Sequence, residues 1–298
     1  MPRTAVCVEV VEQQGVEWRV RTPPVASPLY FSVRNAKKLK GRTFNGFVAP
    51  RFLYRMIQSL NLLPFRCVEQ FVPIVLPALR GEDGGWQILE NSAIRNLGFR
   101  HTANRFRIID RALEGVHIAK PLTEKINERN KLTEQVFPPG RHLVINGAGG
   151  GISCAACLFI DDNPDIVVDQ TLYWRTVATA EEAWYRVGLL NSSAISQAIR
   201  PFNPQGEFGA RHLHTLPHRV IPAFDESNEN HREIARLARR LSERAHALIS
   251  AHQDIQAPSG GIPARRRKLR SFLRLSGETQ QLETVCAAVL GTTPDEDA

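Results

Sequence analysis

The sequence of 298 residues lacks long hydrophobic runs: none approaches the length of about 18 residues that a membrane-spanning helix needs. No charged segment followed by an apolar one opens the chain, so a signal peptide is not indicated. Cysteine is also scarce, and five residues at irregular positions favour reduced thiols over a disulfide framework. We therefore expect a cytoplasmic protein with no membrane partner. With 43% hydrophobic residues, it is expected to bury a substantial core.

Acidic residues are absent from Trp18 to Val68, whereas basic residues are frequent there. The ten basic residues are Arg19, Arg21, Arg34, Lys37, Lys38, Lys40, Arg42, Arg51, Arg55 and Arg66. A second block, His231 to Arg274, holds eleven lysines and arginines against three acids. A single basic run is as often a solvated face as a binding surface. Two such blocks favour a nucleic-acid partner.

Hydrophobic patterning predicts an α+β fold, in which a mixed β-sheet region with hairpins is combined with helices and ends in a long amphipathic helix. The expected strands are a hairpin over 4–20 around Gly15, an edge strand over 67–79, and strands over 142–146, 153–160 and 165–177. The expected helices cover 49–65, most of 103–135, a stretch capped by Thr179 with a break at 191–193, and 229–253.

Four consecutive segments follow from this pattern. Residues 1–140 form a connecting basic α+β region, and 141–228 form a target-recognition region. Residues 229–256 form a long helix that packs back on the domain, and 257–298 hold a linker, a basic segment and an acidic tail.

The glycine-rich stretch NGAGGGIS, residues 146–153, is a candidate cofactor loop. A dinucleotide fingerprint needs G-x-G-x-x-G between a strand and a helix, but the sixth position here is Ile152. The segment that follows is strand-like, so no helix N-terminus is available to receive an anion. The pattern favours a hairpin tip, with glycines that let the backbone approach a partner closely.

Two further patterns suggest metal chemistry. Cys154 and Cys157 form one C-x-x-C motif, and a zinc site would have to add His212, His214 or His218. An isolated pair within an apolar strand is more typical of core residues, and the histidines fit donors in a basic loop. The acidic string from Asp161 to Asp169 could hold Mg²⁺ in a nuclease, but no Asp/Glu-x-Lys element follows it. A turn entering a strand is the simpler interpretation.

A set of short elements then carries a family resemblance. They are Leu172-Tyr173-Trp174, Leu190-Asn191-Ser192, Gly206 to Arg211, Ile221 to Asp225 and His231 to Ala235. In this order they resemble the C-terminal target-recognition region of N6-adenine DNA methyltransferases from bacterial restriction-modification and phage-defence systems. The front half, including RFLYRMIQSLNLLPFR and LTEQVFPPGRHLVIN, is similar to the connecting region of that family. The resemblance covers about residues 2–250.

The catalytic elements of that family have no counterpart in this sequence. Its Asp/Asn-Pro-Pro-Tyr/Phe tetrapeptide is missing, and Asn163-Pro164-Asp165-Ile166 lacks the second proline and the aromatic residue. The glycine-rich methyl-donor loop is also missing. The resemblance therefore implies a specificity part that is not catalytic alone and binds no cofactor itself. S-adenosylmethionine is then expected in a catalytic methyltransferase partner, and double-stranded DNA is the expected ligand.

Candidate DNA-contacting residues follow from the two glycine-containing tips and from the first basic block. Arginine, histidine and small polar residues at such tips can reach base edges, and the arginines of the block can neutralise phosphates. The candidates at the tips are Asn146, Gly149, Gly150, Ser153, Arg200, Gln205, Arg211, His212 and His214, and the phosphate candidates are Arg42 and Arg51. Two alternatives stay open: an interaction subunit of a defence complex that binds DNA weakly or not at all, and an autonomous nuclease that uses Asp165 or Asp169.

Overall fold

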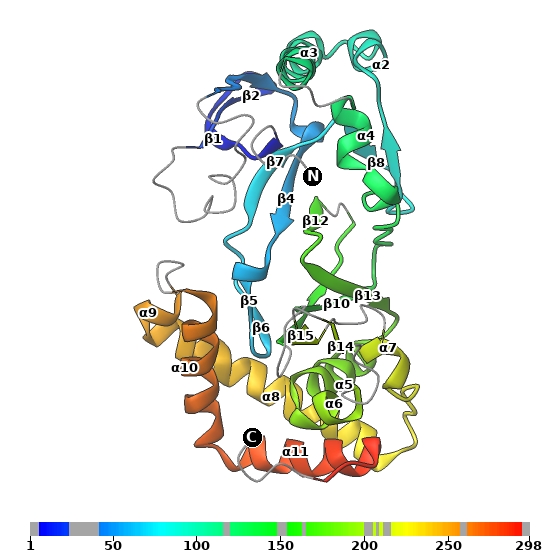
Figure 1. The fold of residues 1–298 in the computed structure, drawn as a ribbon, viewed down its shortest axis with the longest axis vertical. Helices are drawn as coiled ribbons and strands as arrows, with labels where there is room; N and C mark the ends of the chain where they lie inside the picture. Colours follow the sequence, from blue (N-terminus) through cyan, green and yellow to red (C-terminus); the bar gives the residue numbers. More distant parts are fainter. Residues whose placement is uncertain are drawn as a thin grey trace. The chain divides into compact units, whose positions relative to one another are not determined.

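The structure is a computed structural model with an α+β fold (Figure 1). It describes residues 6–23, 42–115, 120–147, 154–162, 165–199, 205–206, 209–210, 216–256 and 261–293. Within this part of the chain, no helix is long and apolar enough to cross a membrane.

The chain divides into two compact units that are interleaved along the sequence. Unit 1 comprises 1–57, 71–139 and 162–168, and unit 2 comprises 58–70, 140–161 and 169–298. The four segments expected from the sequence follow one another along the chain. Each of the two units, by contrast, is made of three separate stretches of chain.

Unit 1 begins with the expected hairpin. β1 (Glu9–Gln14) pairs with β2 (Glu17–Arg21), and Gly15 takes the left-handed turn position with φ 62°. β2 pairs in turn with β3 (Gly46–Val48), which completes a three-stranded sheet. The hairpin prediction is therefore confirmed.

The helix predicted over 49–65 is wrong. Residues 53–57 form strand β4 (Leu53–Ile57), and two short 3-10 turns, η3 (Pro50–Phe52) and η4 (Ser59–Asn61), flank it. β4 is the central strand of a second sheet, between β7 (Val72–Val75) and β12 (Ile166–Val168), as Figure 1 shows. The pairing partners lie far away in the sequence, so local helical spacing was outweighed by long-range strand pairing.

The edge strand expected over 67–79 is divided in the structure, and β7 is its middle part, which lies at the edge of this sheet as its prolines predicted. Pro73 is paired with Arg55 on one side, and its carbonyl accepts a hydrogen bond from the Val8 amide at 2.9 Å on the other. After β7 the chain forms a hairpin from β8 (Ala78–Arg80) and β9 (Trp86–Ile88). The Arg80 guanidinium lies 4.0 Å from the centre of the Trp86 ring and donates to the carbonyl of Ile166 at 2.6 Å, which ties this hairpin to β12.

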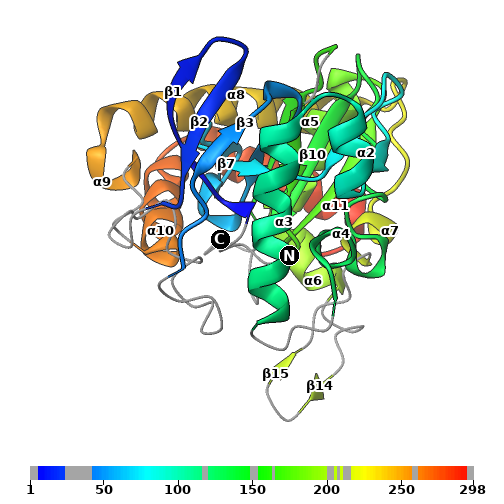
Figure 2. The ribbon, with the colours of Figure 1, turned by 90° about the horizontal axis from the view of Figure 1, so that it is seen from above.

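The helices of unit 1 follow the hairpin. They are α2 (Asn91–Asn96), α3 (Arg100–Glu114) and α4 (Leu122–Ile126), with a 3-10 turn η5 (Glu128–Asn130). The prediction of a mostly helical 103–135 is confirmed, although the helices begin earlier. α3 lies beside β3 (Figure 2), and its buried face, which includes Phe106 and Ile109, packs into the core of the unit.

Unit 2 is organised around one antiparallel sheet. β10 (His142–Gly147) is its central strand, between β11 (Ala155–Phe159) and β13 (Leu172–Val177). β10 and β11 are consecutive in the chain, so the strand-loop-strand unit around the glycine-rich stretch is confirmed. Residues 148–153 themselves lie outside the described residues.

The single strand expected over 165–177 is divided in two. β12 belongs to unit 1, and β13 belongs to unit 2. Asp169 makes the break between them: its carboxylate accepts from the hydroxyl of Thr171 at 2.7 Å, and its carbonyl accepts from the Leu172 amide at 2.9 Å. An aspartate that closes such a turn on itself interrupts a strand.

Helices cover one side of the sheet and form the rest of unit 2. They are α5 (Ala180–Asn191), α6 (Ser193–Ile199), α7 (Leu216–Val220), α8 (Glu229–Ala251), α9 (Gln253–Gln256), α10 (Ile262–Arg274) and α11 (Gly277–Leu290). The long amphipathic helix is confirmed as α8, with Asn228 as its N-cap, but it does not end the fold, because α9, α10 and α11 follow it. Short strands also occur, β5 (Leu62–Leu63) with β6 (Arg66–Cys67) and β14 (Gln205–Gly206) with β15 (Gly209–Ala210).

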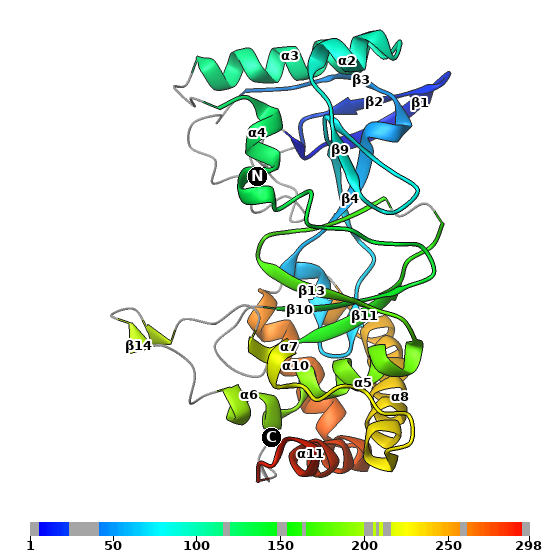
Figure 3. The same cartoon turned by 90° about the vertical axis from the view of Figure 1, so that its right-hand side faces the viewer.

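The core of unit 2 depends on a close approach of α5 and α8 (Figure 3). Gly188 of α5 faces α8, and a Cβ atom at this position would lie 2.6 Å from Cγ2 of Ile234. The break that ends α5 is also where expected, since Ser192 is non-helical. Asn191 is 6% exposed, and its side chain bonds the backbone of Ala155 in both directions. This amide therefore fixes α5 to the sheet.

Candidate nucleic-acid interface

Asn146 lies at the end of the central strand β10, one residue before the last position of the strand. It is paired with Ala155 of β11 and with Tyr173 of β13. The side chain is 1% exposed, so the described position is within the protein and not at an exposed tip. Gly149, Gly150 and Ser153, the other candidates on this loop, lie outside the described residues.

The side chain of Asn146 contacts α7. Its Oδ1 atom lies 3.0 Å from Nε2 of His218. Asn146 is the first residue of the glycine-rich stretch 146–153, and His218 follows the second glycine-containing tip, which holds the candidates from Arg200 to His214; we call these two stretches the first and second recognition segments. The contact therefore brings one end of each segment together within unit 2.

His218 is held in its neutral form. Burial lowers its pKa to about 4, and the positive charges of Arg186 and Arg175 lower it further in the same direction. A neutral imidazole carries one N–H, and the amide oxygen of Asn146 can only accept. The proton is therefore assigned to Nε2, which leaves Nδ1 without a proton; Nδ1 is buried and has no hydrogen-bond partner in the described part of the chain.

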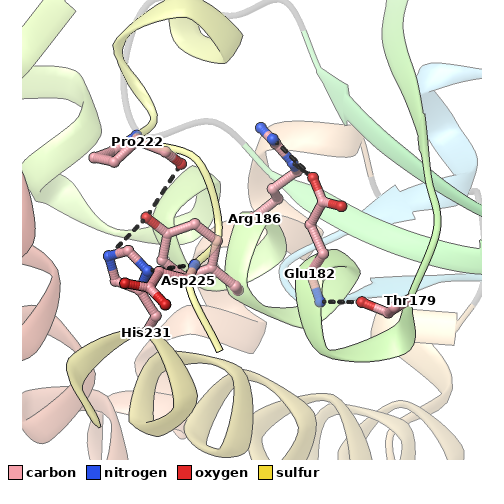
Figure 4. Close-up of polar contacts among 7 residues, drawn as sticks. Thr179, Glu182, Arg186, Pro222, Asp225 and His231 are labelled. Carbon is pink, nitrogen blue, oxygen red and sulfur yellow. Dashed lines mark hydrogen bonds and ion pairs between the residues drawn. The ribbon is translucent and has the colours of Figure 1, made fainter. Parts of the chain in front are cut away.

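Arg186, which acts on His218, is fixed at the start of α5 (Figure 4). The hydroxyl of Thr179 accepts a hydrogen bond from the Glu182 amide at 3.2 Å, which confirms the predicted N-cap. The Glu182 carboxylate accepts from Nε of Arg186 at 2.9 Å. The arginine side chain is only 5% exposed. This ion pair orients a buried guanidinium next to α7.

These groups border a cavity of about 460 Å³ in unit 2. Its lining residues are Arg175, Thr179, Glu181, Glu182, Arg186, Ala223, Phe224 and Glu226. Because the lining holds two arginines and three glutamates, its charge does not favour a phosphate over other ligands.

A second polar network fixes the segment after α7 to α8 (Figure 4). Nδ1 of His231 accepts from the Asp225 amide at 3.0 Å, while Nε2 lies 3.5 Å from the Tyr185 hydroxyl. That hydroxyl donates to the carbonyl of Pro222 at 3.4 Å. Burial lowers the pKa of His231, which keeps the ring neutral in this role. Residues within 221–225 and His231, which carry part of the family resemblance, therefore stabilise the contact between this segment and α8.

The second recognition segment is described only in part. Gln205 contributes its backbone to the short ladder of β14 and β15, in which it pairs with Ala210. Arg200, Arg211, His212 and His214 lie outside the described residues. Their predicted contacts with bases stay predictions.

Two arginines of α10 lie at the base of the glycine-rich loop. The guanidinium of Arg266 lies beside Gly147, within 3.7 Å of where a Cβ atom would stand. The guanidinium of Arg270 lies 3.5 Å from Sγ of Cys154, the first described residue after 148–153. Sequence reasoning did not connect these arginines with the loop, because more than a hundred residues separate them and no local pattern marks the contact.

The same helix, α10, also anchors the segment of unit 2 that leads into β5. Arg265 is 3% exposed, and its guanidinium donates to the carbonyls of Ile255, Leu60 and Gln256 at 2.7, 3.0 and 3.2 Å. Arg266 donates to the carbonyls of Leu62 and Ser59 at 3.0 and 2.9 Å. Much of the positive charge in this segment therefore serves the interior of unit 2.

The cysteines and acids do not form a metal site in the part that the structure describes. Among those residues, no three His, Cys, Asp or Glu side chains come close enough to hold an ion. Burial raises the pKa of the Cys157 thiol to about 12, which disfavours the thiolate that zinc needs. Asp165 is bound by Arg55, with an Nη2 to Oδ1 distance of 2.6 Å, and Asp169 closes its own turn.

The two phosphate candidates, Arg42 and Arg51, are exposed residues of unit 1. Arg51 lies over the ring of Phe99, 5.5 Å from its centre, and Arg42 has its guanidinium beside Gly115. Phe99 and Gly115 flank α3 at its two ends. Arg51 and Arg42 therefore lie near the two ends of α3, a relationship that the sequence did not indicate.

No protein-family model matches the chain, and no curated protein matches it.

Proposed function

We propose that this protein recognises double-stranded DNA sequence-specifically, as the specificity part of a split or multi-subunit adenine-N6 DNA methyltransferase. Its setting would be restriction-modification or phage defence. The chain would act with a catalytic methyltransferase subunit, which would bind S-adenosylmethionine.

The observation that carries the proposal is the contact between Asn146 and His218. It holds one end of each predicted recognition segment at the same place in unit 2. Base readout needs several side chains held in a fixed register with one another, and a shared rigid base provides this. The buried hydrogen bond gives the two segments such a base.

Positive charge near the first segment supports the same proposal. Arg266 lies beside Gly147 and Arg270 lies beside Cys154, the two described residues that flank 148–153 in the chain. Their side chains are engaged with the protein, so we assign them a supporting field rather than direct contacts with phosphates. The resemblance of the elements from Leu172 to Ala235 to target-recognition regions supplies the methyltransferase part of the proposal.

The loop itself provides the test. Replacing Gly149 and Gly150 by alanine should lower affinity or selectivity for DNA without loss of the fold, because glycine permits close backbone approach to a ligand. Fluorescence anisotropy with labelled duplexes measures the affinity, and circular dichroism checks the fold. Unchanged affinity and selectivity in the folded variant would assign the loop to a turn with no role in recognition.

A second experiment tests the partner. Purification of the tagged chain from its native host should yield a methyltransferase-like subunit, and the complex should transfer methyl groups to adenine in duplex DNA. If such a subunit co-purifies while the chain shows no salt-dependent DNA binding, the interaction-subunit alternative replaces DNA recognition.

A further inference from the structure

The solvent-facing side of α3 in unit 1 carries a row of basic side chains. Arg100, Asn104, Arg107 and Arg111 are spaced by four, three and four residues, which places them on one face of a helix. The opposite face holds Thr102, Phe106, Ile109 and Leu113, all of them buried. The row therefore points away from the core; we call Arg100, Arg107 and Arg111 the α3 ridge.

The charge of the α3 ridge is not neutralised by carboxylates in the described structure. Arg107 donates to the side-chain oxygen of Asn104 at 2.7 Å, and no ion pair joins Arg100 or Arg111 to a described carboxylate. Asp110, the acid within the helix, is occupied by Asn91 and by the amide of Leu122. Glu114, the last residue of α3, is exposed.

The arginines on α8 have a different environment. Arg236, Arg239 and Arg240 pair with Glu233, Glu243 and Glu278, at 2.5, 3.4 and 3.7 Å. A polyanion approaching α8 would have to compete with these carboxylates. The structure therefore leaves more arginines without a described carboxylate partner on α3 than on α8.

Neighbouring residues extend the basic surface of α3. Arg42 and Arg51 lie at its two ends. A groove of about 280 Å³ lies between residues of α2 and α3, and Arg95, Arg107, Ser92 and Asn96 are among its lining residues. Two guanidinium groups with a hydroxyl and an amide beside them offer the donors that phosphate oxygens accept.

We infer that the α3 ridge binds the phosphate backbone of double-stranded DNA, independently of base sequence. From Arg100 to Arg111 the helix rises about 16 Å, and a duplex carries roughly ten phosphates over that length. The ridge can therefore meet phosphates at many registers, as sequence-independent binding requires. The inference rests on the proposed function for the identity of the polyanion, and it assigns unit 1 a role in affinity.

The test is the salt dependence of binding to a random-sequence duplex. The variant Arg100→Gln/Arg107→Gln/Arg111→Gln should bind roughly 10- to 100-fold more weakly at 0.15 M salt. The slope of log K against log salt concentration should become shallower by about 2.7, because three phosphate contacts are lost. Selectivity among sequences should not change, since the ridge does not read bases.

A matched control removes the same charge from α8. Arg236→Gln/Arg239→Gln/Arg240→Gln has the same net charge as the ridge variant, and it should change the slope by less than about 1. Glu114→Gln should raise the affinity slightly. Equal effects of the two triple variants, or a ridge variant that binds like the wild type, would overturn the inference. If the wild-type protein binds no duplex at any salt concentration, both the proposed function and the inference about the α3 ridge fail. If the wild type binds DNA and the ridge variant binds it equally well, only the inference fails.

Discussion

The Oδ1 atom of Asn146 lies 3.0 Å from Nε2 of His218, and this hydrogen bond joins the central strand of unit 2 to α7. It links two stretches that are 72 residues apart in the chain. Asn146 is 1% exposed and His218 is half-buried, so removing one partner leaves the other largely shielded from water without its hydrogen bond, which costs stability.

Replacing Asn146 by alanine should destabilise the protein by about 1–3 kcal/mol, because the N–H of His218 would lose its acceptor. Urea unfolding followed by circular dichroism measures this change. The same variant should also lose DNA selectivity at protein concentrations where it remains folded. Wild-type selectivity in the folded variant would separate the hydrogen bond from recognition.

His218 also predicts how stability depends on pH. Its pKa in the folded protein is lowered to about 4, compared with about 6.5 in an unfolded chain. Between these values the unfolded chain takes up a proton that the folded protein does not, so stability is lost as the pH falls from about 6.5 toward 4. His218→Gln keeps a donor for Asn146 but does not titrate, and this variant should lose less stability than the wild type between pH 7 and pH 4.5. Equal losses in urea unfolding would argue against a neutral His218.

The packing of α5 on α8 gives a prediction at Gly188. A methyl group there would lie 2.6 Å from Cγ2 of Ile234, whose branched side chain has little freedom to move. Gly188→Ala should destabilise by roughly 1–3 kcal/mol, despite the better helix propensity of alanine. Gly277→Ala in α11 is the control, because nothing lies within 4 Å of its new methyl group, and it should be neutral or slightly stabilising. A neutral Gly188→Ala would mean that the two helices are further apart than described.

The basic segment of α10 holds both a buried arginine, Arg265, and an exposed one, Arg267, which allows their contributions to stability to be compared. Arg265→Met should destabilise by roughly 2–4 kcal/mol, since three backbone carbonyls lose the charged donor that binds them. Arg267, two residues further along α10, is exposed, and Arg267→Met should change stability by no more than about 0.5 kcal/mol. Thermal unfolding of both variants makes the comparison, and similar melting temperatures would contradict the buried role of Arg265.

Local patterns in the sequence predicted those elements whose signals are local. The turn at Gly15 needs a left-handed residue, Thr179 accepts from the amide three residues ahead, and the apolar stripe from Ile234 to Ile249 recurs at helical spacing. Each signal lies within a few turns of chain, so sequence alone was sufficient.

Long-range pairing decided the rest. Phe52, Met56 and Ile57 fit a helical stripe, yet their segment pairs with β7 and with β12, which lies more than a hundred residues away in the chain. The contact between Asn146 and His218, and the inward turn of Arg265, likewise depend on tertiary packing. Arg100, Arg107 and Arg111 were visible in the sequence, but their exposure and their lack of carboxylate partners in the described structure were not.

Selection of duplexes from a randomised pool tests the central claim most directly. The wild-type protein, alone or with its catalytic partner, should enrich a defined sequence motif over successive rounds. Arg211→Ala/His212→Ala should retain salt-dependent binding but lose the motif, because the phosphate contacts would persist without base readout. A pool that stays random with the wild-type protein and its partner would contradict sequence-specific recognition by this chain.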